Sequence, residues 1–466
     1  MIRSSAWTRR TVLPWVVVGG ALFLAKGASA EETVGALTAD ANAATVDNDR
    51  WEYFTTGRIS NFVSWAKGDG MPQATTNDLE TGQPLHQVLT GTGGSGYAVS
   101  SARYKPKADG TPSNVLVSSI DSMRVRSGFT GNIIAFGMRR KFGPSTTVTG
   151  YLSLTSLVDS QSQKKYFLNP PDVREGYIRI EGNWGSVLAG RSGVLFNRGA
   201  VVTDFLYLHG YGLGFPADIN STGGYPTAGQ IGFGVLANGF GAGFVYSTPV
   251  VLGTQLSLGL YDPASLTGSS IERTRFLRPE FELITNQQFG ALVKAHVYFN
   301  GGYQVNYQQN KTDDITKALY GVGYGTRIEV GPVHLAAGGH RGKGLGLAYP
   351  GLPSDAVYDL SSNLRDTDGF FVMAQLALGG RVDLNGGFGR TIIHMTTIDL
   401  TSDPKNPTGD PTSSIIQNQT GISGAVVVHV RPWLHFDVDV MFADSKWNLG
   451  ERQKIAFYNA GTTITW

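Results

Sequence analysis

Cysteine is absent from this chain of 466 residues, and charged residues make up only 16% of it. Without cysteine, the protein has neither a disulfide framework nor a thiolate-bound metal site. The 38 lysine and arginine residues nearly balance the 36 aspartate and glutamate residues. This balance gives no reason to expect a nucleic-acid partner.

Common catalytic motifs are absent as well. The eight histidines form no H-E-x-x-H pattern, no serine lies in G-x-S-x-G, and the glycine-rich runs lack the spacing of a phosphate-binding loop. We therefore expect no enzymatic activity, no cofactor and no bound metal.

Long apolar runs are missing beyond the N-terminal region, so no transmembrane helix is expected there. A basic stretch over residues 3–10 precedes an apolar run over 12–24, and an A-x-A cleavage pattern ends at Ala30. We predict a cleaved signal peptide over residues 1–30, with a twin-arginine signal left open, and a periplasmic segment over 31–50. Membrane insertion after export then requires a β-barrel, because only helices and closed barrels satisfy all backbone groups in lipid.

Glycine (62 residues) and aromatic residues (11%) are abundant instead, as expected of a β-rich protein with many turns and two membrane interfaces. From Trp51 to Trp466, segments of alternating polarity are separated in turn by short turns and long polar loops. We predict an all-β fold for residues 51–466, a transmembrane antiparallel β-barrel of about sixteen strands. A soluble sandwich shows the same alternation. The export signal, the loop asymmetry and the aromatic ends favour a membrane barrel over such a sandwich.

The strand assignment is specific at several places. Over 318–330, glycine and charged residues alternate with apolar residues, so one face suits water and the other suits lipid. A strand is predicted over 229–248, and a tight turn is predicted at 286–288.

The stretch from Glu175 to Arg191, EGYIRIEGNWGSVLAGR, predicts two strands joined by a tight turn at 183–185. A glycine-rich and aromatic-rich loop over residues 192–228 follows, and a loop of this length is typically functional. At the C-terminus, alternate residues lead to a terminal aromatic residue, and they include Tyr458, Ile464 and Trp466.

Both features resemble the trimeric general porins of Gram-negative outer membranes. The stretch over 175–191 is similar to the strand, turn and strand that end in Gly-Arg before the third extracellular loop of that family. The C-terminus looks like the family's signal for barrel assembly, although a terminal phenylalanine is commoner there. The resemblance implies that the loop over 192–228 folds into the lumen and narrows it. It also implies a homotrimer in outer-membrane lipid, and a barrel-assembly machinery that recognises the C-terminal residues.

Charged side chains on the strands are expected to line a lumen or the rims, because exposing Lys or Arg to the lipid midplane costs about 2 to 4 kcal/mol. Arg124 and Arg126 share a strand face, as do Arg179, Glu175 and Glu181. Charges at a narrow point of a pore bias which solutes pass. The predicted lumen charges are Arg124, Arg126, Arg179, Arg191, Asp204, Asp218, Asp437 and Asp439.

The resemblance also implies that basic residues on the wall face acidic residues on the third loop. In this chain the loop contains only Asp204 and Asp218, fewer acids than in the family, so size-limited and weakly selective diffusion is predicted. We therefore predict an outer-membrane porin for passive diffusion of small hydrophilic solutes and ions. The alternatives are a substrate-specific channel for sugar or phosphate, and a non-conducting barrel that serves as a surface adhesin or structural protein.

Overall fold

The computed structural model describes residues 50–69, 119–127, 131–156, 172–206, 229–263, 272–290, 292–309, 314–347, 357, 363–397, 416–447 and 452–466. The predicted signal peptide, all but the last residue of the segment over 31–50, and Asp218 lie outside the described residues. In the part of the chain that the structure describes, no helix is long and apolar enough to span a membrane.

The described residues form eighteen strand segments and a short helix, α2 (Arg198–Thr203). The segments are β1 (Glu52–Asp69), β2 (Ser119–Arg126), β3 (Asn132–Phe142), β4 (Thr146–Ser156), β5 (Asp172–Gly182), β6 (Gly185–Gly193), β7 (Phe240–Ser247), β8 (Thr254–Tyr261), β9 (Glu272–Thr274), β10 (Arg278–Phe289), β11 (Val293–Gln309), β12 (Asp314–Val330), β13 (Val333–Lys343), β14 (Asp366–Leu378), β15 (Val382–Ile393), β16 (Ile416–Arg431), β17 (Leu434–Trp447) and β18 (Arg452–Thr465).

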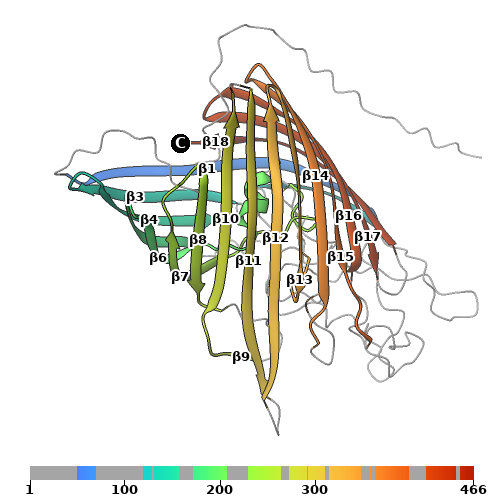
Figure 1. Cartoon of the computed structure of the whole chain (residues 1–466). Helices are drawn as coiled ribbons and strands as arrows, with labels where there is room; N and C mark the ends of the chain where they lie inside the picture. Colours follow the sequence, from blue (N-terminus) through green and yellow to red (C-terminus); the bar gives the residue numbers. More distant parts are fainter. Residues whose placement is uncertain are drawn as a thin grey trace, which may run out of the picture.

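The segments form one closed antiparallel sheet, in which β1 pairs with β18 (Figure 1). β2 and β3 both pair with β1 and are two parts of one wall strand. β9 and β10 likewise both pair with β11. Eighteen segments less these two interruptions make sixteen wall strands, which confirms the predicted all-β antiparallel barrel.

The two faces of the wall differ in polarity as the alternation predicts. On β17, Phe436, Val438 and Phe442 are 49%, 60% and 51% exposed, whereas the intervening Asp437 and Met441 are 1% and 0% exposed. On a closed barrel, the exposed apolar face is the outer one. The inner face is the buried one, so this molecule is not a soluble sandwich, in which apolar side chains fill the interior.

The strand predicted over 229–248 begins only at Phe240. The preceding residues, 229–239, lie against the inner wall, where Gly234 N donates a hydrogen bond to Thr391 Oγ1 (2.8 Å). Their regular alternation of glycine and apolar residues has the period of a strand, but these side chains pack on the wall instead of extending it.

The predicted turn at 286–288 is also wrong, because β10 continues through it to Phe289. The chain turns at Gly290, whose φ of +65° favours glycine. Asn286 is a polar residue within the strand, and its side chain hydrogen-bonds His296 of β11 at 2.7 Å.

Candidate functional site: the inner wall and the loop packed on it

The chain leaves β6 at Gly193 and runs to α2, which contacts β11, β12 and β13. The wall holds this outgoing arm, residues 194–206, through backbone groups: Phe196 N donates to Glu280 (2.8 Å) and Asn197 N donates to Asn300 Oδ1 (3.1 Å). In Figure 1, α2 lies inside the barrel near β11 and β12. The outgoing arm is therefore anchored to one sector of the inner wall.

An ion pair strengthens this anchor. Arg198 Nε lies 2.8 Å from Glu282 Oε2, and the Glu282 side chain is fully buried. Burial disfavours the charge of Arg198, but the Glu282 carboxylate offsets this effect and raises the pKa of the guanidinium above its ordinary value. Removing one partner of such a buried pair is strongly destabilising. The sequence analysis did not identify Glu280 and Glu282 as site residues. Two acids at alternate positions of one strand share a face, and this pattern could have indicated them.

Glycines on the inner face make room for the outgoing arm. A Cβ at Gly321 would lie 2.6 Å from the Phe196 ring, and one at Gly323 would lie 2.7 Å from Asn197 Oδ1. These glycines belong to the face over 318–330 that was predicted to suit water. They instead form a seat for the loop, because only a residue without a side chain lets the arm approach the sheet.

The return arm, residues 229–239, is anchored to a different sector of the wall. Gln230 Nε2 donates to Ser423 Oγ of β16 (2.5 Å), and Gln419 Nε2 donates to the carbonyl of Gly232 (2.8 Å). A Cβ at Gly389 of β15 would lie 1.8 Å from the Phe233 carbonyl oxygen. The described ends of the loop thus rest on two adjoining parts of the inner wall, which meet at β13.

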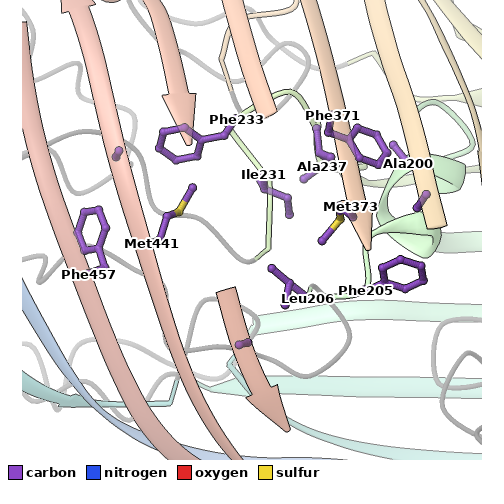
Figure 2. Packing of buried hydrophobic residues seen from close by; sticks show 14 of the residues in the cluster. Ala200, Phe205, Leu206, Ile231, Phe233, Ala237, Phe371, Met373, Met441 and Phe457 are labelled. Atoms are coloured by element: carbon purple, nitrogen blue, oxygen red, sulfur yellow. The ribbon is translucent and has the colours of Figure 1, made fainter. Parts of the chain in front are cut away.

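Apolar side chains of both arms form a cluster inside the barrel (Figure 2). Phe233 of the return arm is directed toward Met441, whereas the ring of Phe205 of the outgoing arm lies 6.2 Å from that of His334 on β13. Phe205 and Phe233 are 3% and 1% exposed. Full burial of such a side chain is worth about 1.5 to 3 kcal/mol, so apolar contacts and hydrogen bonds hold the arms together.

A second loop packs on the first near the ends of β13 and β14. Leu345 and Leu364, which flank the connection between these strands, are buried in one cluster with Phe196 and Leu236 of the two arms. The inner side of this sector is therefore covered by two loops.

Asp204 joins the two arms and does not face open solvent. It is 0% exposed. Its carboxylate accepts hydrogen bonds from Leu206 N (2.8 Å) and Gln230 N (2.7 Å), one from each arm. The predicted lumen charge is thus a structural acceptor, and its companion Asp218 lies outside the described residues.

The inner face of β5 is open by contrast. It carries Glu175, Tyr177, Arg179 and Glu181 in alternation, and all four are only partly buried. Arg179 Nε lies 2.9 Å from Glu181 Oε2, with side chains that are 31% and 42% exposed. The predicted shared face of these charges is confirmed, and it is accessible to water.

Arg124 and Arg126 belong to β2. Their backbones pair with Ser64 and Phe62 of β1, whose side chains are buried, whereas Val125 between them is 63% exposed. The lumen role of the two arginines stays a prediction.

The predicted lumen position of Arg191 is wrong. In the register of β5 and β6, it pairs with Gly176 and shares a face with Val187, which is 36% exposed on the outer side. Its Nε donates to the carbonyl of Arg174 (3.1 Å). Arg191 therefore lies at the rim of the barrel, where β6 ends; the rim was the other location expected for charged residues.

Asp437 and Asp439 lie on the inner face as predicted, but they are covered. They are 1% and 5% exposed, and Asp439 accepts a hydrogen bond from Asn459 Nδ2 at 2.7 Å. Neither carboxylate is open to a passing solute in this structure.

The C-terminal residues close the barrel. Tyr458, Ile464 and Trp466 are 40%, 40% and 46% exposed on one face of the last strand, as their alternation predicts. Gly57 N donates to the carbonyl of Trp466 (3.1 Å), which ties the last residue to the first strand. Their recognition by assembly machinery stays a prediction.

Neither a protein-family model nor a curated protein matches the sequence with significance. Solved structures match in fold. The outer membrane channel DcaP of Acinetobacter baumannii is 12% identical, with a TM-score of 0.57 over 90% of this chain and 99% of that chain. The anion-selective porin from Comamonas acidovorans is 10% identical, with a TM-score of 0.51 over 90% and 100%. Salmonella typhi OmpF is 11% identical, with a TM-score of 0.51 over 90% and 99%. At such low identities the likeness concerns the fold, and the chain has the barrel fold of these porins and channels.

Proposed function

We propose that the protein is an outer-membrane porin that forms a water-filled channel for passive diffusion of small hydrophilic solutes and ions. The observation that carries this proposal is the division of the inner wall. The loop arms cover the sector from β10 to β17, whereas the inner face of β5 stays accessible to water and carries charges of both signs. The fold shared with an outer membrane channel and an anion-selective porin supports it.

In this proposal the loop that begins after Gly193 narrows the lumen, because its two arms are tied to neighbouring sectors of the inner wall and pack together inside the barrel. Arg124, Arg126 and Arg179 bias the passage of ions, since charges at a narrow point act through the low-dielectric wall. Charges of both signs on the open face make this bias weak. Export by the predicted signal peptide, insertion in outer-membrane lipid and assembly as a homotrimer belong to the same proposal.

Recording from planar bilayers tests the proposal. Folded protein extracted in detergent is expected to give stepwise increases in conductance. If folded barrels give no steps, the protein is a non-conducting barrel with a structural or adhesive role. A current that one solute class blocks in a saturable way identifies a substrate-specific channel instead of a general one.

A further inference from the structure

The open inner face carries an aromatic pair that simple diffusion does not require. Tyr177 of β5 stacks on Tyr151 of β4, with ring centroids 5.1 Å apart and an angle of 27° between the ring planes. Both residues are only partly buried. On its other side, Tyr177 pairs with Gly190 of β6, which in turn pairs with Gly243 of β7. Because both neighbours are glycines, neither Gly190 nor Gly243 has a side chain that could cover the Tyr177 ring.

Charged groups of both signs flank this ring along the strand. Glu175 and Arg179 lie two residues before and after Tyr177, and hence on the same face. The Glu175 carboxylate accepts a hydrogen bond from the Gly193 backbone N–H at the base of the loop. Arg179 is held by Glu181 at 2.9 Å. A hydrogen-bond acceptor and a donor are thus positioned on either side of the ring.

We infer that Tyr177, with Tyr151 behind it and Glu175 and Arg179 beside it, is a binding platform for neutral cyclic sugars. The inference rests on the proposed channel function and names its solute class. A pyranose ring has an apolar face of C–H bonds that packs on an aromatic ring. Its hydroxyl groups donate to a carboxylate and accept from a guanidinium. Paired charges of opposite sign suit a neutral, hydroxyl-rich solute better than an ion.

Calorimetric titration of the folded protein in detergent with maltose tests the inference independently of conductance. Maltose is expected to bind saturably, whereas sorbitol, an acyclic polyol without a ring face, is expected not to bind. Tyr177→Ala is expected to weaken maltose binding about tenfold, because one stacking contact is lost. Tyr177→Phe keeps the ring and is expected to keep the binding.

Tyr53→Ala is the matched control, because Tyr53 lies on the outer face of β1 and is 77% exposed. It is expected to leave maltose binding unchanged. The inference is overturned if the wild-type protein does not bind maltose, if sorbitol binds equally well, or if Tyr177→Ala and Tyr53→Ala bind alike. Tyr151→Ala provides a second test if Tyr177→Ala fails to fold. Conductance without maltose binding would reject the sugar platform alone, and maltose binding without conductance would reject the channel alone.

Discussion

On β5, the inner-facing pair of Arg179 and Glu181 is 31% and 42% exposed, whereas on β10 the Glu282 side chain that pairs with Arg198 is fully buried. Both pairs join an arginine to a glutamate on the inner side of the barrel. They differ because the outgoing loop arm covers β10 and leaves β5 open. The comparison teaches that an inner-facing ion pair is accessible to water where the arm does not cover it, and that under the arm such a pair holds the loop to the wall.

The strongest contrast is expected from the same substitution in the two pairs. Glu282→Gln leaves the Arg198 charge buried without its carboxylate and should reduce the free energy of unfolding by about 3 kcal/mol. Glu181→Gln, in the exposed pair, should reduce it by only about 0.2 to 1 kcal/mol. Denaturant-induced unfolding in detergent micelles measures both. Equal losses would mean that the two regions do not differ in coverage.

Two glycines of β15 allow a steric version of the comparison. Gly389→Val places a side chain where the Phe233 carbonyl lies, at 1.8 Å from the new Cβ, whereas the nearest atom to a Cβ at Gly386 is 4.0 Å away. Gly389→Val should cost about 1 to 3 kcal/mol, displace the return arm and raise the single-channel conductance. Gly386→Val is the control and should leave the conductance unchanged. A similar conductance for the two variants would show that the return arm does not limit the pore.

A substitution of Asp204 tests whether a carboxylate in the covered region has a structural or an electrostatic role. Asp204→Asn turns an N–H group toward the backbone donor of Leu206 or Gln230 and should weaken the junction of the arms by about 1 kcal/mol. Because the residue is fully buried, the expected result is a noisier open-channel current with an unchanged reversal potential in a salt gradient. A shift in reversal potential without added noise would show that Asp204 acts as a charge of the lumen and not as a structural acceptor.

The smallest effect is expected from single charges at the open face. Arg179→Gln should move the reversal potential slightly toward cation preference, because one positive charge leaves the water-accessible wall. Arg191→Gln removes the same charge from the outer face at the rim and should leave the reversal potential unchanged. If Arg191→Gln has the larger effect, the path of ions runs elsewhere.

Much of the wall was predictable from local pattern. Period-two alternation and short turns identify the strands. The turn predicted at 183–185 is one residue shorter in the structure, where Gly182 pairs with Gly185 across Asn183 and Trp184. Across such a turn an odd-numbered residue pairs with an even-numbered one, as Tyr177 does with Gly190, so Arg191 cannot share the face of Arg179. The predicted turn of three residues would place Arg191 on the face of Arg179, and the observed turn of two residues places it on the other face, because a shift of one residue reverses every side chain.

The return arm shows where local pattern is insufficient. Its glycine and apolar residues alternate like those of a strand, and Phe233 is buried against Met441 of a strand about two hundred residues away in sequence. No local signal distinguishes such a segment from the wall on which it packs. The same holds for the tyrosine platform, because Tyr151 and Tyr177 stack only through the register of β4 and β5.

The stretch over 175–191 and the alternation around it specify a sixteen-stranded antiparallel barrel with a long loop after Gly193 and an apolar outer face. Packing in three dimensions settles what each inner-facing residue does. It buries Asp204, Asp437 and Glu282, and it leaves Tyr177 and Arg179 only partly buried. The physical reason is that alternation determines the face on which a side chain lies. Whether a loop crosses over that face depends on contacts between segments far apart in the chain.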